Sequence, residues 1–200
     1  VFTGQHKDMY LQLKNSIPTP DYWLDVMRIR SSLADTISSI ILKMDQILAK
    51  GETRFLIVQG DTSSSFACAL SAFNNKVPIG HVEAGLRTYN IGSPFPEEGY
   101  RQMMARIATL HWAPTKKALD NLSSEGIKNA RLTGNTIIDA CSTRNLEIKY
   151  GNTVLVTINR RENYGERMKK IFSEIEELAG KLPDLEFIFP MSPNPNVKSN

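Results

Sequence analysis

Apolar residues along the first sixty positions follow two different patterns. Over residues 31–49 they recur every three or four positions, which predicts an amphipathic helix. Ser32 and Asp35 stand at its start with the spacing of a capping box. The run Phe55–Val58 is instead short, continuous and rich in branched residues, and it ends just before Gly60. That composition is typical of a strand buried on both faces of a parallel sheet.

The two patterns then alternate to the end of the chain. Further strands are expected at residues 77–82, 111–113, 131–133, 153–158 and 185–189. Further helices are expected at residues 65–73, 97–108, 116–124, 137–146 and 168–182. Strands that alternate with helices in this way form parallel sheets joined by right-handed crossovers. The sequence therefore predicts the α/β fold class, with doubly wound parallel sheets.

The alternating segments divide near Gly134 into two unequal sets. Residues 1–134 hold most of one Rossmann-like lobe, and residues 135–200 hold only the first strand, helix and strand of a second. The chain opens at Val1 without an initiator Met, as though at the end of a strand, and closes soon after the last predicted strand. We therefore expect two lobes, both incomplete in this chain.

Composition narrows the classes of partner. Of the 200 residues, 41% are apolar and 22% charged, and 24 basic against 21 acidic residues leave a net charge of +3. That charge is small and evenly spread, so nucleic acid is not expected as a partner. No apolar run approaches the ~20 residues of a membrane span, so no membrane partner is expected. Cys68, Cys141 and the three histidines have no metal-ligand spacing, so no metal site is expected.

Three acidic residues fall just beyond predicted strands or in the first turn of a helix. In open α/β sheets, ligands bind outside the carboxyl ends of the strands. Asp61 follows a strand and precedes a Thr-Ser-Ser-Ser run, so a helix cap and a catalytic acid are both open. Glu83 ends an apolar strand, where a partly desolvated carboxylate favours a functional site. Glu97 follows Pro96 in a first helical turn, where acidic residues are also ordinary helix-dipole chemistry.

The arginines and histidines indicate a functional site less clearly than the acidic residues do. Arg160 and Arg161 stand at a later strand-to-helix junction, where guanidinium groups and helix amides favour an anionic ligand. A solvated pair bonded to Glu162 gives the same pattern. His81 and His111 lie in predicted strands and are more simply core histidines. Neither the Gly-x-Gly-x-x-Gly fingerprint nor a P-loop occurs. The residues alone thus permit acid–base work on an anionic small molecule.

Eight short sequence motifs follow one another along the chain in a characteristic order and spacing. They are Thr3-Gly4-Gln5-His6, Gly60-Asp61-Thr62, His-Val-Glu-Ala-Gly-Leu-Arg-Thr at 81–88, Ser-Pro-Phe-Pro-Glu-Glu at 93–98 with Arg101, Ala113-Pro114-Thr115, Thr133-Gly134-Asn135-Thr136, Arg160-Arg161-Glu162-Asn163 and Asn194-Pro195-Asn196-Val197. Together they resemble the non-hydrolysing UDP-N-acetylglucosamine 2-epimerases, over all 200 residues. That family has a two-lobed glycosyltransferase-B architecture, which the resemblance implies here.

The resemblance also implies an activity, that of an isomerase which interconverts UDP-N-acetylglucosamine (UDP-GlcNAc) and UDP-N-acetylmannosamine (UDP-ManNAc). In the family, UDP is eliminated to leave 2-acetamidoglucal and is then re-added, with a proton returned to the opposite face of C2. A carboxylate base and a second acid suit this chemistry, because C2–H is a poor acid until the C1–O bond weakens. The resemblance implies a UDP-sugar substrate, no metal or cofactor, a homodimer, and a cytoplasmic role in polysaccharide biosynthesis.

Carried over by position, the resemblance assigns roles to three groups of residues. The expected catalytic acids are Asp61, Glu83 and Glu97. The expected substrate-binding residues are Asn159, Arg160 and Arg87. The residues that match the site where bacterial members bind a second, activating UDP-GlcNAc are Gln5, His6, Arg30 and Arg160.

The sequence departs from the family pattern at two positions. Asn159 precedes Arg-Arg-Glu-Asn where the family has His, and an amide can donate a hydrogen bond but cannot carry charge or a proton. Ser192 stands where the family has an imidazole of the activator site. These departures leave two alternatives to the epimerase: a 2-epimerase of a modified UDP-amino sugar, or a catalytically silent relative that binds a sugar nucleotide.

Overall fold

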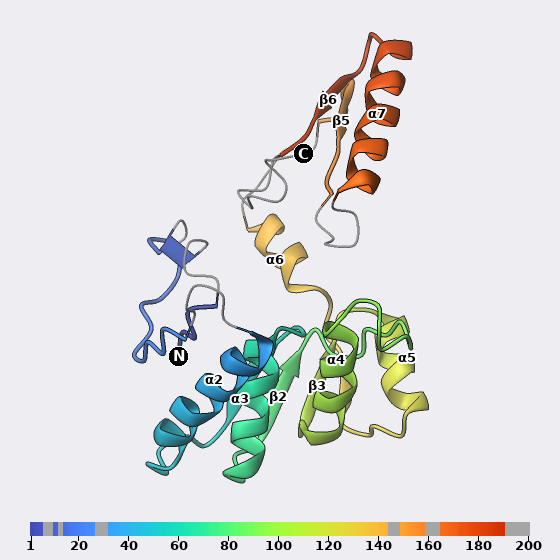
Figure 1. Ribbon diagram of the computed structural model, residues 1–200. Coiled ribbons are helices and arrows are strands. Elements are labelled where there is room, and N and C mark those ends of the chain that lie inside the picture. Colours follow the sequence, from blue (N-terminus) through green and yellow to red (C-terminus); the bar gives the residue numbers. More distant parts are fainter. Residues whose placement is uncertain (6–9, 12–13, 27–31, 144–148, 159–164, 191–200) are drawn as a thin grey trace. The chain divides into compact units, whose positions relative to one another are not determined.

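The computed structural model describes residues 1–5, 10–11, 14–26, 32–143, 149–158 and 165–190 (Figure 1). The chain forms two compact units, Val1–Asn145 and Leu146–Asn200. Helix α6 (Thr136–Ser142) groups with the first unit, whereas the sequence suggested a boundary after Gly134. The lobe to which residues 135–145 belong therefore stays a prediction.

A four-stranded parallel sheet forms the centre of the first unit. Its strands, in spatial as well as chain order, are β1 (Leu56–Gln59), β2 (Ile79–Val82), β3 (Leu110–Ala113) and β4 (Ala130–Leu132). The helices of this unit include α2 (Leu33–Leu48), α3 (Ser63–Asn74), α4 (Glu97–Ile107) and α5 (Lys116–Ser124). The predicted alternation and the α/β fold class are confirmed.

The connecting helices lie over one face of this sheet. Because each strand pairs with the next one in the chain, right-handed crossovers place α3, α4 and α5 on the same side, and Figure 1 shows α3 and α4 running along the strands. Val58, His81 and His111 are register partners across three strands, and all are buried. Ile57 points to the opposite face and is 61% exposed. The prediction that Phe55–Val58 is buried on both faces is therefore wrong, because the crossovers cover one face.

Small residues let α3 pack closely against α2. The fully buried apolar residues that these two helices contribute to one core include Ile40, Met44, Ala67, Ala69 and Ala72. The start of α2 is fixed by the predicted capping box: Ser32 Oγ accepts from the Asp35 amide and Asp35 Oδ2 accepts from the Ser32 amide, both at 3.0 Å. A stacked pair, Phe66 on Tyr100 at 4.8 Å, then joins α3 to α4.

The second unit contains one strand–helix–strand motif. Strands β5 (Thr153–Leu155) and β6 (Glu186–Ile188) pair in parallel, and α7 (Glu166–Lys181) connects them. Met168 of α7 is fully buried, and Phe172 meets Phe189 edge to face at 5.1 Å. In the part of the chain that the structure describes, no helix is long and apolar enough to cross a lipid bilayer.

The segment after β2 is seated directly on α5. Gly85 has a positive φ of 89°, and a Cβ at this position would lie 2.2 Å from the carbonyl oxygen of Ala118. Asn121 Nδ2 donates to the Gly85 carbonyl at 2.9 Å. Only glycine allows this close approach, so the position of the loop after Val82 depends on it.

We expect Gly85→Ala to lower the free energy of unfolding by roughly 2–4 kcal/mol, because it adds both left-handed strain and a backbone overlap. Gly99→Ala in α4 is the matched control, since a Cβ there meets nothing closer than 3.9 Å. Urea unfolding measured by circular dichroism compares the two variants. Equal stability of both would contradict the packing of Gly85 on α5.

Candidate active site

Two of the predicted acids meet at neighbouring strand ends. Asp61 follows β1 after the turn at Gly60, and Glu83 follows β2. An oxygen of Glu83 lies 3.5 Å from the position that a Cβ on Gly60 would occupy, so the Glu83 carboxylate faces the turn that carries Asp61. Because β1 and β2 pair in register up to Gln59 and Val82, the sheet itself brings these two side chains together.

Glu83 has an unusual backbone and an unusual environment. Its φ is +66°, a left-handed conformation that costs a residue other than glycine of order 1 kcal/mol and clusters at functional sites. Burial, and then the negative charge of Asp61, raise the pKa of Glu83, while the charge of Arg101 opposes them. Among the described residues, Glu83 has no hydrogen-bond or ion-pair partner. A carboxyl group in such a place keeps its proton to a higher pH than an exposed one and is a candidate for proton transfer.

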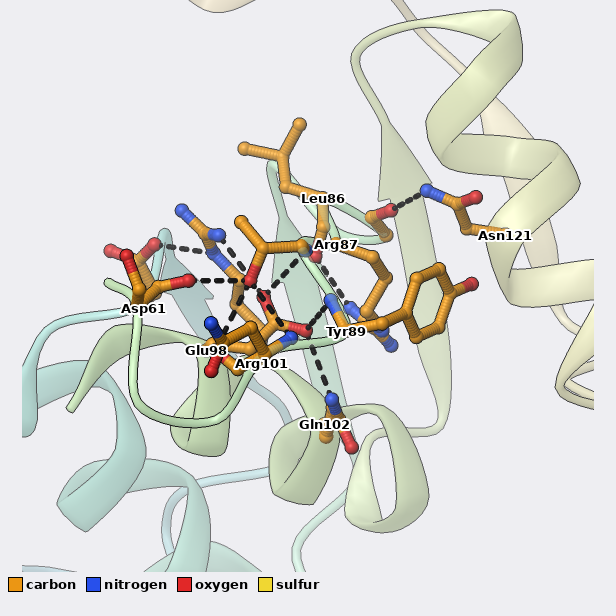
Figure 2. A network of polar contacts seen from close by, with 12 residues as sticks. Asp61, Leu86, Arg87, Tyr89, Glu98, Arg101, Gln102 and Asn121 are labelled. Atoms are coloured by element: carbon orange, nitrogen blue, oxygen red, sulfur yellow. Dashed lines mark hydrogen bonds and ion pairs between the residues drawn. The ribbon is translucent and has the colours of Figure 1, made fainter. Parts of the chain in front are cut away.

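Arg101 of α4 bridges two carboxylates (Figure 2). Its Nε donates to Asp61 Oδ2 at 2.7 Å, and its Nη1 donates to Glu98 Oε2 at 3.3 Å. The side chains of Arg101 and Asp61 retain 16% and 24% of their exposure, so this ion pair is partly shielded from solvent. Asp61 therefore has a fixed cationic partner, whereas its neighbour Glu83 has none in the described part of the chain.

Glu98 is the acid that sequence reasoning missed. Its side chain is fully buried, and besides Arg101 it accepts from the amides of Thr88 and Tyr89 and from Gln102 Nε2, at 3.0, 3.1 and 2.9 Å. Burial alone would raise the pKa of Glu98, but these hydrogen bonds outweigh it and lower the pKa. The signal in the sequence is the Glu-x-x-Arg spacing of residues 98 and 101, which places both side chains on one helix face.

Glu97, the predicted third acid, opens α4 directly after Pro96 and is half-buried. In the region described, no hydrogen bond or ion pair joins Glu97 to Asp61 or Glu83. The adjacent residues Glu97 and Glu98 thus differ: Glu98 is fully buried, whereas Glu97 stays half-buried in the first turn of the helix. The catalytic assignment of Glu97 stays a prediction.

Arg87 holds the loop after β2 to the end of α5. Its side chain is fully buried, and its Nε and Nη2 donate to the two carboxylate oxygens of Glu125 at 2.7 and 3.0 Å. Its Nη1 donates to the carbonyl of Leu86 at 2.8 Å. Every nitrogen of this guanidinium therefore binds the protein, and the assignment of Arg87 to substrate binding stays a prediction.

His81 fixes the turn that precedes Asp61. Its Nε2 lies 2.8 Å from the Gly60 carbonyl, which can only accept, so Nε2 carries the proton. Burial is the main cause that lowers the pKa of His81, so the ring is neutral at pH 7. The ring of His111 lies 6.5 Å away, edge to face, and within the described residues neither Nδ1 has a partner. Both histidines are core residues, as expected, but each retains an unpaired nitrogen.

Only some of the predicted activator-binding residues lie in the described ranges. Gln5 Oε1 accepts from the amide of Ser64 at 3.1 Å, which puts Gln5 beside the start of α3. Other residues singled out from the sequence lie outside the described ranges, namely His6, Arg30, Asn159, Arg160 and Ser192. Their assignments stay predictions. Among the residues that the structure describes, no group of three or more His, Cys, Asp or Glu side chains is placed to hold a metal ion.

Comparison with known proteins gives a consistent answer. The family model described as UDP-N-acetylglucosamine 2-epimerase matches residues 1–200. The UDP-N-acetylglucosamine 2-epimerases of Salmonella borreze and Bacillus subtilis (strain 168) are 39% and 38% identical to this chain over 98% of its length. The crystal structure of UDP-GlcNAc 2-epimerase from Neisseria meningitidis bound to UDP-GlcNAc matches with a TM-score of 0.87 at 37% identity, over 98% of this chain and 58% of that one.

The structure is that of an α/β protein with a pair of carboxylates at its strand ends. The proteins to which the chain is similar are epimerases of nucleotide sugars. The chain belongs to the UDP-N-acetylglucosamine 2-epimerase family. It spans about half the length of the curated relatives it matches, 57% of the Salmonella protein and 55% of the Bacillus protein. The family resemblance seen in the sequence is thereby confirmed.

The buried His111 gives a stability prediction. Burial is the main cause that lowers the pKa of His111 to about 4, and the charge of a protonated His81 is the next. The charge of Arg87 lowers this pKa further, whereas a hydrogen bond to the backbone of Ala108 raises it. The unfolded chain therefore takes up this proton below about pH 6.5, before the folded chain does, and stability falls as the pH drops from 6.5 towards 4.

We expect His111→Gln to flatten this dependence, because the variant lacks the titrating ring. The parent should lose up to about 2 kcal/mol more than the variant between pH 7 and pH 5. Urea unfolding at both pH values measures the difference. Carboxylates with low pKa values, such as Glu98, titrate at lower pH and affect both proteins equally. Parallel curves for parent and variant would refute the role of His111.

Proposed function

We propose that the protein is a non-hydrolysing UDP-GlcNAc 2-epimerase, which interconverts UDP-GlcNAc and UDP-ManNAc. The observation that carries this proposal is the pair of carboxylates, Asp61 and Glu83, at adjacent strand ends in a chain of this family. The relative from N. meningitidis was crystallised bound to UDP-GlcNAc, which supports a UDP-sugar as the substrate. By the same family argument, we propose a homodimer that acts in the cytoplasm and supplies polysaccharide synthesis.

Inversion at C2 needs one group that removes the proton from one face and a second that returns a proton to the other. As C2–H and C1–O break, a C1–C2 double bond forms and UDP leaves with the C1–O electron pair, giving 2-acetamidoglucal. Re-addition of UDP then follows protonation of C2 on the opposite face. The two carboxylates exchange roles in the reverse reaction.

The inequality of the two carboxylates supports this scheme. Asp61 has Arg101 as a partner at 2.7 Å, while Glu83 lies next to Asp61 and has a raised pKa. Such a pair offers two carboxyl groups in unlike electrostatic surroundings, which suits proton transfer at opposite faces. We propose Glu97 as a third acid and Arg87, Asn159 and Arg160 as substrate-binding residues, all on the motifs that contain them. The motifs also support Gln5, His6, Arg30 and Arg160 as an activator site.

Proton NMR of UDP-GlcNAc in deuterated water, with the full-length natural polypeptide, tests the proposal. We expect deuterium to enter C2 and a UDP-ManNAc signal to appear, because elimination exchanges the C2 proton with solvent. Absence of exchange in a sample that binds UDP would favour the silent sugar-nucleotide binder, to which Asn159 in place of the family's His also points. Exchange with a modified UDP-amino sugar alone would instead identify that sugar as the substrate.

We expect Glu83→Gln and Asp61→Asn each to lower kcat by on the order of 10²–10⁴-fold, since each removes one proton-transferring group. UDP binding, measured by titration calorimetry, should change little, because neither substitution alters the shape of the side chain. Glu52→Gln, at an exposed position of the same unit, is the control and should retain parental activity. Full activity of either site variant would overturn the acid–base assignment.

A further inference from the structure

Glu98 is the one acidic side chain that is fully buried among the described residues. A carboxylate in the interior is costly unless its oxygens are fully hydrogen-bonded. Glu98 meets this condition with four donors. Oε1 accepts from the Tyr89 amide and Gln102, and Oε2 accepts from the Thr88 amide and Arg101.

The four donors come from two different places. The Thr88 and Tyr89 amides belong to the loop that continues from Glu83, and Tyr89 has a positive φ of 58°. Arg101 and Gln102 belong to the first turns of α4, on the same helix as Glu98. A single carboxylate therefore ties the loop after the catalytic pair to the helix that carries Arg101 (Figure 2).

Arg101 is thereby held between two anions. Its guanidinium has a fixed fork geometry, and two of its three nitrogens bind carboxylates, Nη1 that of Glu98 and Nε that of Asp61. Asp61 and Arg101 are the charged groups that act on Glu83 within the described part of the chain. The position of Arg101 consequently decides which of the two catalytic carboxylates receives the ion pair.

We propose that Glu98 is a positioning residue, which directs Arg101 to Asp61 and keeps it away from Glu83. This inference rests on the proposed function for its catalytic meaning, but the arrangement itself concerns the free protein. Loss of the Glu98 charge leaves Arg101 with one carboxylate, Asp61, in place of two and without its anchor on α4. The field of Arg101 at Glu83 then increases, and the Glu83 carboxyl group loses its proton more easily.

The test compares Glu98→Gln with Gln102→Met. Glu98→Gln keeps the shape of the side chain and removes its charge, whereas Gln102→Met removes one hydrogen bond to Glu98 and keeps the charge. Carbon-13 NMR of carboxyl-labelled, ligand-free protein follows the titration of Glu83 directly. We expect the Glu83 midpoint to fall by about one pH unit in Glu98→Gln, and to stay at its parental value in Gln102→Met.

Kinetics supply a second readout. We expect Glu98→Gln to lower kcat by roughly 10–100-fold with little change in KM, and to move the alkaline limb of the kcat profile to lower pH. A parental Glu83 midpoint in Glu98→Gln would overturn the inference, whatever the loss of activity, because a merely structural role predicts that result. The NMR titration needs no turnover, so failure of the epimerase proposal is detected separately.

Glu98→Asp covers the case in which Glu98→Gln does not fold. It retains the negative charge on a side chain shorter by one methylene group, so it still pairs with Arg101 but holds the loop amides less well. We expect a reduced kcat but a Glu83 midpoint within about 0.3 pH units of the parent, because the charge is kept. A midpoint that falls as the charge is retained would refute the proposal.

Discussion

The ion pair between Arg101 and its two carboxylates is the constraint on which the rest of the site depends. Asp61 lies at the end of β1 and Glu98 lies in the first turn of α4, 37 residues later in the sequence. One guanidinium joins them, so the end of the strand and the start of the helix are fixed to each other. Because Glu98 is buried, its satisfaction is also a condition for folding, and the loop amides at 88 and 89 must close onto it.

The segment after β2 divides its residues between architecture and chemistry. Gly85 rests on the backbone of α5, and Arg87 binds Glu125 at the end of that helix. These contacts anchor the loop to α5, while Glu98 anchors it to α4. Glu83, at the start of the same segment, is left with a strained backbone and no described partner. This segment, whose residues the sequence suggested as ligand contacts, thus serves in large part to hold the Glu83 carboxylate in place.

Most elements could be predicted from the sequence because their signals are local. Period-three and period-four spacing, short apolar runs and the Ser32–Asp35 box each depend on a few neighbouring residues. The environment of β1 could not be predicted, because exposure of Ile57 depends on which face the crossovers cover. Glu97 and Glu98 are likewise adjacent acids in a helical first turn, and sequence could not tell which of them enters the core. That choice is made by the direction of the helix face and by Arg101, three residues on from Glu98.

A reaction that exchanges a proton between opposite faces of one carbon benefits from two acids that are alike in chemistry and unlike in charge state. Identical carboxylates in identical surroundings would share their protons, and both proton-transfer directions would suffer. In this fold, β1 and β2 supply two equivalent strand ends, and the helix that follows supplies a single cation. The asymmetry therefore comes from the burial of Glu83 and from the ion pair that α4 gives to Asp61. In the proposed reaction, this difference in surroundings would make one carboxylate the base and the other the acid.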